Sequence, residues 1–397
     1  MKNQIYQYCL PFLIIILLTS CSNEKNPNIL GKEVRTSIIL ENLKVEEYPS
    51  VKMDDDNHFI YLGNDPDCVI NGIDKITFCD QKPIILDKKQ KALFVFDEAG
   101  RFISKIHDVG NGPNEYIQLN DFCISEQTKS IFALVVAGIH KSVVYEYGLD
   151  GKQKNRFKLP FIAYNIGTFD NCLVFFSNFS SSMKKDFNIH ITTKECKVIS
   201  KHFPYTRRSN LEWGYSSDVF IQYEDQLFYQ PVFCDTIYHI SDSQSVKPFI
   251  LLKEKEVSDT HQHLDVYMNT SMDKFFEYSE KNPFRQFSNL IITEDSIFFS
   301  SDNQGMEESY IFHIKSNKLR LLRGGDYFSL LKASPLLVYE NYLIAAIYPY
   351  EIHNFVNTIQ KRVSSKGWEE FQSNNNCLIE IFENTTPNDN PVIIKFN

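Results

Sequence analysis

The chain has 397 residues with 41 basic and 50 acidic side chains, which give a formal net charge of −9. A nucleic-acid surface needs concentrated lysine and arginine to displace counterions, so this balance argues against nucleic acid as a partner. After residue 20, no stretch approaches 18 consecutive apolar residues, so no later segment is expected to span a membrane.

The first 20 residues, MKNQIYQYCLPFLIIILLTS, have the pattern of a secretion signal. One lysine precedes an apolar run from Leu10 to Leu18, which has the length of a signal core and is short for a transmembrane helix. An uncleaved anchor helix is the alternative. Removal of these residues takes away only Lys2, so the mature chain keeps 40 basic and 50 acidic residues.

The segment Leu18-Thr19-Ser20-Cys21 resembles the lipobox of bacterial lipoproteins. The resemblance implies cleavage before Cys21, which then carries a lipid anchor in the membrane. Residues 21–33 follow as a polar tether. Ser22 stands where an aspartate usually marks retention in the inner membrane. The resemblance therefore favours an outer-membrane lipoprotein, on the periplasmic or the surface-exposed face.

Seven cysteines remain outside the signal and the lipobox, at positions 68, 79, 123, 172, 196, 234 and 377. Their odd number, wide spacing and lack of a Cys-x-x-Cys pair fit neither a disulfide framework nor a zinc site. Most lie within apolar runs, where a free cysteine packs as a small hydrophobic residue. One pair, Cys68 with Cys79, could still close in an oxidising compartment.

Pairs of apolar runs separated by short polar turns recur along the mature chain. Six such hairpins cover residues 92–106, 142–159, 187–203, 236–252, 309–322 and 377–396. A simpler hairpin precedes each of them, at 76–86, 121–136, 165–177, 219–233, 290–301 and 336–348. The runs are rich in Val, Ile, Phe and Tyr and alternate with polar residues, which is typical of half-buried strands.

Four strands in each of six units, at a period of about 40–70 residues, predict one all-β domain over residues 34–397. It is a six-bladed β-propeller of four-stranded antiparallel blades. A sandwich would not repeat in this way, and a doubly wound sheet needs a helix between successive strands. An N-terminal strand near 34–47 or 58–62 should pair with 391–396 and close the ring, because an open edge invites association.

Several phrases in the chain carry a family resemblance: FIYLGNDPDCVINGIDKI (59–76), VFDEAGRFISKI (95–106), GNGPNEY (110–116) and DNPVIIKF (389–396). Together with the lipobox, they resemble the six-bladed, NHL-like β-propeller lipoproteins that are abundant in Bacteroidetes. The resemblance covers the whole mature chain. It implies the fold and export, and it implies almost nothing about the activity, because that family is largely uncharacterised. Asn114 stands where that family often has glycine.

The stretch GNGPNEY resembles a phosphate-binding glycine loop only at first sight. Such a loop needs a following helix whose amide groups face the anion. The residues that follow, IQLNDFCIS (117–125), alternate like a strand. The stretch is therefore interpreted as a turn between the first two blades. Gly110 and Gly112 are expected to supply backbone angles that other residues resist, and Pro113 to fix one dihedral angle.

Loop length indicates which face of the propeller is used. With the strands of a blade named A to D outward from the axis, the A-to-B and C-to-D turns lie on one face, called here the short-turn face. The D-to-A and B-to-C connections lie on the other, the long-connection face. The second set is expected to be long, with two helical insertions at 253–288 and 349–376 whose apolar stripes pack on the propeller, or else form a lid or docking surface. Long loops on one face indicate a binding site there.

The loop FPYTRRSNLEWGYSS (203–217) places aromatic and arginine side chains together, as a sugar or acidic glycan would require. A purely structural role, with Trp213 wedged between blades and the arginines in solvent, is equally compatible with the pattern. The predicted ligand-binding residues are Tyr205, Arg207, Arg208, Trp213 and Tyr215, with Asn111, Asn114 and Glu115 on a neighbouring loop and Arg285 and Trp368 on the insertions.

No catalytic motif is present in the sequence, which lacks Gly-x-Ser-x-Gly, His-Glu-x-x-His and the sialidase-type Asp box. His261 and His263 would point to different sides of a helix and so would not converge on a metal. We expect no metal and no cofactor. The sequence favours a non-catalytic lipoprotein that captures a glycan or peptide, beside an outer-membrane transporter complex. The alternative is a surface or periplasmic carbohydrate-active hydrolase or lyase with its site in the propeller funnel.

Overall fold

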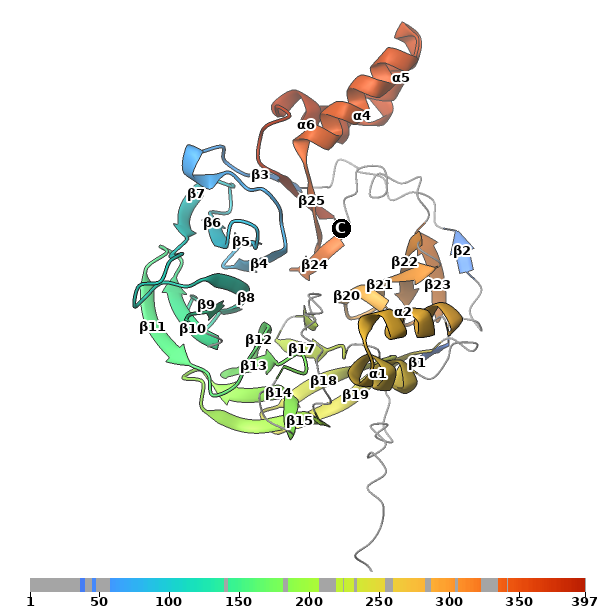
Figure 1. The fold of residues 1–397 in the computed structure, drawn as a ribbon. Coiled ribbons are helices and arrows are strands. Elements are labelled where there is room, and N and C mark those ends of the chain that lie inside the picture. Colours follow the sequence, from blue (N-terminus) through green and yellow to red (C-terminus); the bar gives the residue numbers. More distant parts are fainter. Residues whose placement is uncertain are drawn as a thin grey trace, which may run out of the picture.

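A computed structural model describes the six sheets of the protein and their connections. The residues described are 36–39, 45–47, 58–138, 142–180, 185–206, 219–223, 225–231, 234–253, 260–282, 287–303, 306–322, 335–340 and 342–396. Each sheet contains four antiparallel strands, two sheets have a fifth strand at the outer edge, and the sheets stand around one axis (Figure 1). The prediction of a six-bladed β-propeller is confirmed.

The blades follow one another along the chain, and each begins at its innermost strand. Blade 1 consists of β4 (Lys75–Cys79), β5 (Lys82–Asp87), β6 (Ala92–Phe96) and β7 (Phe102–Ile106). Blade 2 consists of β8 (Gln118–Ser125), β9 (Ser130–Val136), β10 (Ser142–Gly148) and β11 (Gln153–Lys158). Blade 3 consists of β12 (Asn165–Phe169), β13 (Cys172–Phe176), β14 (Lys185–Thr193) and β15 (Val198–Thr206). Blade 4 consists of β16 (Phe220–Tyr223), β17 (Gln226–Tyr229), β18 (Thr236–Asp242) and β19 (Ser245–Lys253). Blade 5 consists of β20 (Phe287–Ile292), β21 (Ser296–Asn303), β22 (Met306–His313) and β23 (Lys318–Leu322). Blade 6 consists of β24 (Pro335–Tyr339), β25 (Tyr342–Ile347), β26 (Val392–Phe396) and β3 (His58–Tyr61).

The hydrophobic core lies between the blades, and it explains why the middle strands are apolar on both faces. Along β6, Leu93 and Val95 face blade 2, whereas Phe94 and Phe96 face blade 6. All five residues of this strand are buried. A strand that is covered on both faces loses the alternation of polar and apolar residues and reads as one continuous apolar run.

The ring closes when the N-terminal strand β3 pairs with the C-terminal strand β26, with Ile60 opposite Ile393. This is one of the two closures that the sequence allowed. The buried residue Asn390, which stands two positions before β26, reinforces this pairing. Its side-chain oxygen accepts a hydrogen bond from Ile70 N, and its side-chain nitrogen donates to the carbonyl oxygens of Gly63 and Cys68. One side chain therefore joins two parts of the chain that are more than 300 residues apart.

The other candidate segment for closure, residues 34–47, has a different place. Its strands β1 (Thr36–Ile39) and β2 (Val45–Glu47) add in parallel to the outer edges of blade 4 and blade 5. They pair with β19 and β23, so these two blades have a fifth, short strand. The chain thus lies along the rim of two blades before it closes the sixth.

Both insertions are helical, as expected, but the second is longer than predicted. The first contains α1 (Thr260–Asn269) and α2 (Met272–Lys281), and Phe275 is buried in the apolar cluster between blades 3 and 4. The second contains α4 (Pro349–Arg362), α5 (Ser365–Asn374) and α6 (Asn376–Asn384), which project from blade 6 (Figure 1).

The hairpin predicted at 377–396 is therefore wrong, because its first half is the helix α6. A short apolar run does not distinguish a buried strand from a buried helix by its period. The outer place in blade 6, where a second strand of that hairpin would have stood, is filled by β3. In α6, Leu378 and Ile381 instead pack against one face of blade 6, in the apolar cluster that contains Ile347 of β25.

The expected difference in loop length holds for most connections, with two exceptions. On the short-turn face, Asp80 and Gln81 form a two-residue turn with φ of 55° and 61°, the left-handed angles that tight hairpins require. On the long-connection face, residues 88–91 join β5 to β6, and only 304–305 separate β21 from β22. The prediction that every connection on this face is long is therefore wrong at these two places.

The pairing of Asn390 with the N-terminal segment can be tested by substitution. We expect Asn390→Ala to lower the free energy of unfolding by about 2–4 kcal/mol, because it leaves the buried amide of Ile70 and carbonyl of Cys68 without partners. Urea denaturation measures this loss. The control is Asn388→Ala, at an exposed asparagine of the same loop. It should change the free energy of unfolding by less than about 0.5 kcal/mol, as surface substitutions typically do. Equal effects of the two substitutions would contradict the role of Asn390.

Candidate functional site

The six innermost strands enclose a cavity on the propeller axis with a volume of about 1100 Å³. Residues from β4, β8, β12, β16, β20 and β24 all contribute to its wall. The inner strands contact one another in a closed circle, from β4 through β8 and onward to β24 and back to β4. Each position on this wall is therefore fixed by two neighbouring blades, and the cavity is part of the rigid scaffold.

The cavity wall combines aromatic rings with neutral polar side chains. Its partly exposed aromatic members are Tyr223 and Tyr339, whereas the phenylalanines of the lining are buried between the blades: Phe78, Phe122, Phe169, Phe220 and Phe287. The hydroxyl and amide members are Thr77, Thr168, Gln222, Gln230, Ser288 and Asn289. Pockets of this kind bind small molecules, with apolar surface providing contact area and a few polar groups fixing the orientation.

One ion pair stands at the end of the cavity nearest the long-connection face. Lys75 Nζ lies 2.9 Å from Asp121 Oδ1, and the Asp121 side chain is almost completely buried. Asp121 also accepts hydrogen bonds from the backbone amides of Phe122 and Ile166. The carboxylate thus ties blade 1 to blades 2 and 3, and its charge is matched by Lys75.

The opposite end opens among the A-to-B turns of the short-turn face and is rich in carboxylates. Five of these turns contribute an acidic side chain, namely Asp80, Glu126, Asp170, Asp225 and Glu340. Lys129 is the basic residue that the described part of the chain places in the lining at this end. We call this ring of turns the acidic mouth.

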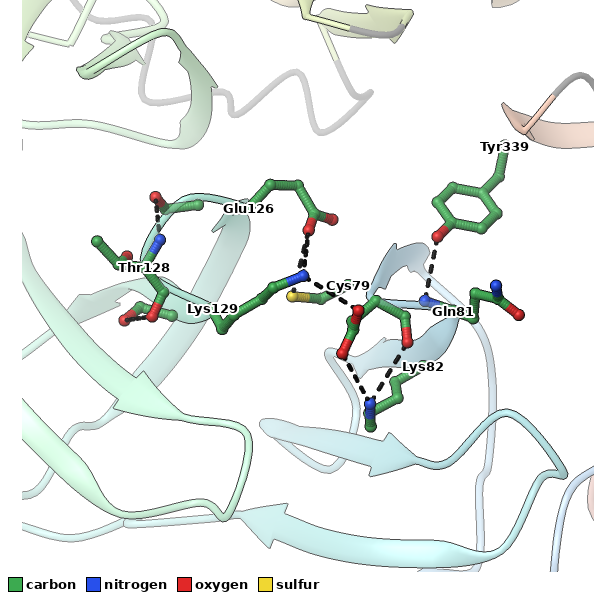
Figure 2. Close-up of polar contacts among 10 residues, drawn as sticks. Cys79, Gln81, Lys82, Glu126, Thr128, Lys129 and Tyr339 are labelled. Carbon is green, nitrogen blue, oxygen red and sulfur yellow. Dashed lines mark hydrogen bonds and ion pairs between the residues drawn. The ribbon is translucent and has the colours of Figure 1, made fainter.

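Polar contacts join three blades on one side of the acidic mouth, as Figure 2 shows. Lys129 Nζ of blade 2 lies 3.2 Å from Asp80 Oδ1 of blade 1 and 3.3 Å from Glu126 Oε2. Lys82 Nζ lies 3.2 Å from the other oxygen of Asp80. On the blade 6 side, the backbone amide of Gln81 donates to the Tyr339 hydroxyl at 3.1 Å.

These contacts keep the ionisable groups in their ordinary charge states. The hydrogen bond from Lys129, followed by that from Lys82, lowers the pKa of the Asp80 carboxyl. Burial, followed by the charge of Glu126, raises the pKa of the Cys79 thiol to about 12. Asp80 is therefore a carboxylate and Cys79 a neutral thiol near pH 7. Neither matches a general acid or base that must exchange a proton near that pH.

The predicted residues of the Gly110–Tyr116 turn lie on the long-connection face, between β7 and β8. The strand that follows confirms that this stretch is a turn between blades and not a phosphate loop. Asn111, Asn114 and Glu115 are exposed. The Glu115 carboxylate is directed back to its own turn, where Oε2 accepts a hydrogen bond from Gly112 N at 2.7 Å.

The expected reason for the two glycines is wrong, because neither has a positive φ. The constraint is close approach instead. A Cβ atom on Gly110 would lie 1.9 Å from Glu115 Oε2, and one on Gly112 would lie 3.0 Å from the same side chain. The glycines leave room for the carboxylate that closes the turn.

The other described candidates stand in separate parts of the molecule. Tyr205, near the end of β15, is largely buried and contacts the ring of Phe179 edge to face, with centroids 5.4 Å apart. Trp368 lies on α5 and stacks on Phe371. Neither is brought next to the Gly110–Tyr116 turn. The remaining predicted residues lie outside the described part of the chain: Cys21, Arg207, Arg208, Trp213, Tyr215 and Arg285.

A model of one protein family matches residues 40–397, nearly the whole chain after the predicted signal and tether. The chain belongs to the DUF4934 family. The family is described as a domain of unknown function, so membership names no activity. No curated protein matches the sequence.

Two crystal structures share the architecture of this DUF4934 protein. A candidate exported protein from Bacteroides fragilis has 17% identity and a TM-score of 0.70, over 91% of this chain and 99% of its own. A DUF4221-family member from Bacteroides vulgatus has 12% identity and a TM-score of 0.51, over 89% of this chain and 98% of its own. At such identities the similarity shows the fold alone.

The described residues of the DUF4934 protein contain no group of three or more His, Cys, Asp or Glu side chains placed to hold a metal. Within the same residues, no helix is long and apolar enough to cross a membrane. The seven cysteines from Cys68 to Cys377 are free thiols, so the disulfide between Cys68 and Cys79 does not form in this structure. Cys68 instead donates a hydrogen bond to Gly63 O.

A polar cluster in blade 3 was not found by motif searching. His190 Nδ1 lies 3.2 Å from Ser177 Oγ, and His190 Nε2 lies 3.6 Å from Asp186 Oδ1. The three residue types are those of a serine-hydrolase triad, but the ring nitrogens are exchanged, because in that triad Nε2 faces the serine and Nδ1 the aspartate. Ser177 is only 1% exposed, however, and the ring of Phe161 stacks on His190 with centroids 3.9 Å apart. No substrate reaches the serine in this arrangement, so the cluster is structural.

The sequence signal for this cluster is an alternation of polar residues along β14. Asp186, Asn188, His190 and Thr192 occupy every second position and are all buried. Burial lowers the pKa of His190 to about 4, although the charge of Asp186 acts in the opposite direction. His190 is therefore neutral at pH 7, and Lys201 also opposes its protonation.

This shift predicts a loss of stability in mild acid. The unfolded histidine titrates near pH 6.5 and the folded one near 4, so the unfolded state binds the extra proton between these values. The stabilisation is complete above pH 6.5 and falls by about 2–3 kcal/mol as the pH is lowered to 4. We expect His190→Gln to flatten the pH dependence of the free energy of unfolding in this window. His107→Gln, at an exposed position, should leave it unchanged, and the same slope in both variants would refute the assignment.

Proposed function

We propose that this DUF4934 protein is an exported, lipid-anchored binding protein whose propeller takes a small ligand, a carbohydrate, into its axial cavity. The observation that supports this most directly is the cavity itself, with about 1100 Å³ of space and contributions from all six blades. Binding sites of drug-sized molecules measure roughly 300–1,000 Å³, so an oligosaccharide of a few units is a suitable occupant.

The composition of the wall favours a sugar among small ligands. The partly exposed rings of Tyr223 and Tyr339 offer flat surfaces for the faces of pyranose rings. Amide side chains such as Gln222 and hydroxyl groups such as Thr168 can both donate to and accept from sugar hydroxyls. The long loop at 203–217, with Trp213 and the arginines, remains a second proposed contact region on the long-connection face.

The acidic mouth argues for binding over hydrolysis. Two carboxylates near a sugar would suggest a glycosidase, in which one of them must be protonated to act as the acid. Here Asp80 and Glu126 share one ammonium group, that of Lys129, and the hydrogen bond from Lys129 lowers the pKa of Asp80. The pair is therefore better suited to holding the blades together than to donating a proton.

Export and anchoring are supported by the signal-like segment at residues 1–20 and by Cys21 in the lipobox pattern. The similar protein from Bacteroides fragilis is also described as a candidate exported protein. A lipid-anchored binding protein of this kind would hold its ligand close to an outer-membrane transporter, which is the partner we propose.

The cavity can be tested by filling it. Thr77 lies in the wall on β4 and is half-buried. We expect Thr77→Trp to abolish carbohydrate binding in a glycan screen followed by calorimetry, because the indole occupies the space of the ligand. Thr358→Trp, on the exposed surface of α4, is the size-matched control and should bind as the wild type does.

The same screen separates the two proposed contact regions. If Trp213→Ala weakens binding at least tenfold, a stacking loss of about 1–3 kcal/mol, and Thr77→Trp has no effect, the site is on the long-connection face and the cavity proposal is wrong. Melting curves for each variant show whether a lost signal reflects unfolding.

The anchor is tested separately from the ligand. We expect Cys21→Ala to remove palmitate labelling and to release the protein from the membrane fraction, because the lipid is the proposed attachment. Fractionation before and after a high-salt wash measures this. A variant that stays with the membrane after the wash would contradict lipid anchoring, whatever the outcome of the glycan screen.

A further inference from the structure

The charges at the acidic mouth are matched on one side of the ring only. In blades 1 and 2, Asp80 and Glu126 pair with Lys82 and Lys129. In blades 3, 4 and 6, the corresponding turns carry Asp170, Asp225 and Glu340. Within the described residues, no lysine, arginine or histidine forms an ion pair with these three.

The three unmatched carboxylates face the same opening and are exposed to water. They come from the tips of two-residue turns, where Asp170 and Glu340 have φ of 47° and 49°. A tight turn with left-handed angles holds the direction of its side chain better than a long loop does. The negative charge is therefore placed at the opening by the fold of each blade.

The interior of the cavity adds no net positive charge that could offset it. Lys75, at the other end, is matched by the buried carboxylate of Asp121. The other polar groups of the wall are mostly neutral amides and hydroxyls. An anion entering from the short-turn face would therefore meet a net negative charge, whereas a cation would be attracted and concentrated at the opening.

We propose that the ligand of the axial cavity is an amino sugar or a short oligosaccharide of amino sugars, bound with a protonated amine against Asp170, Asp225 and Glu340. The inference rests on the proposed carbohydrate-binding function and names the class of sugar. The cavity defines the site and supplies the aromatic and amide contacts to the ring. The carboxylates select the charge of the substituent.

Neutral and acidic sugars would make the same contacts with the cavity wall but interact differently with the three carboxylates. A neutral N-acetylated sugar keeps the stacking and hydroxyl contacts but gains nothing from the three carboxylates. An acidic sugar keeps the same contacts and is repelled at the mouth. The order of affinity is therefore cationic, then neutral, then anionic, and only the difference between classes should depend on salt.

The experiment compares three oligosaccharides of matched length by calorimetry: a glucosamine oligomer, its N-acetylated form and an oligogalacturonate. At 50 mM salt we expect the glucosamine oligomer to bind about tenfold more tightly than the neutral form, since exposed ion pairs each contribute modestly to affinity. At 500 mM salt this preference should fall to less than threefold, because the charges are screened.

A triple variant isolates the contribution of the carboxylates. Asp170→Asn, Asp225→Asn and Glu340→Gln together should bring the cationic and neutral oligomers to equal affinity. The matched control neutralises three exposed acids at C-to-D turns of the same face, Glu98→Gln, Asp150→Asn and Glu195→Gln, and should keep the full preference.

The outcomes distinguish this inference from the proposed function. If the neutral or the acidic oligomer binds as tightly as the cationic one, or the triple variant keeps the preference, the amino-sugar inference is overturned while carbohydrate binding stands. If none of the three binds to the wild type in the cavity, as judged with Thr77→Trp, the proposed function falls and this inference falls with it.

Discussion

The pairing of β3 with β26 is the contact on which the rest of the propeller depends. Without it, blade 6 would have three strands and would lack its outer strand. Asn390 holds the same junction through three hydrogen bonds to backbone groups of residues 63–70. The axial cavity needs all six blades, so its shape depends on a junction made by the two ends of the chain.

We expect this junction to form late in folding. Strand β26 lies at the C-terminal end of the chain, and its outer partner β3 lies near the other end. Blades 1 to 5 can assemble from neighbouring segments, but blade 6 has to wait for the whole chain, because contacts of such large sequence separation form late. We therefore expect the ring of blades to stay unclosed until the C-terminal strand β26 is available.

Much of the fold could be predicted from the sequence because blades repeat. Alternation in runs such as 142–159 and turn residues such as Asp150 and Gly151 are local signals, and eleven of the twelve hairpins needed only these. Residues 377–384 could not be assigned in this way, since an apolar run of that length suits a strand or a helix equally. What decided it was a distant event, the occupation of the outer place in blade 6 by β3.

The candidate site was harder to predict than the fold, for a physical reason. Loop length pointed to the long-connection face, whereas the cavity of the described residues also reaches the A-to-B turns of the other face. Turns such as Asp80–Gln81 and Glu340–Asn341 look like ordinary hairpin tips in the sequence. Only the circular arrangement brings one acidic side chain from each of five blades to a common opening, and that arrangement has no local signal.

The strands β1 and β2 carry a consequence for the solubility of the protein. They cover the outer edges of β19 and β23, in which Ile250 and Leu319 are buried. The edge strand β11 has no such cover, but it exposes Lys154, Arg156 and Lys158, and charges of this kind prevent strands of other molecules from adding. The apolar segment FILL in β19 lacks that protection. A variant that lacks residues 1–47 would therefore keep its six blades but expose the apolar edge strand β19. It would be prone to aggregate through blade 4.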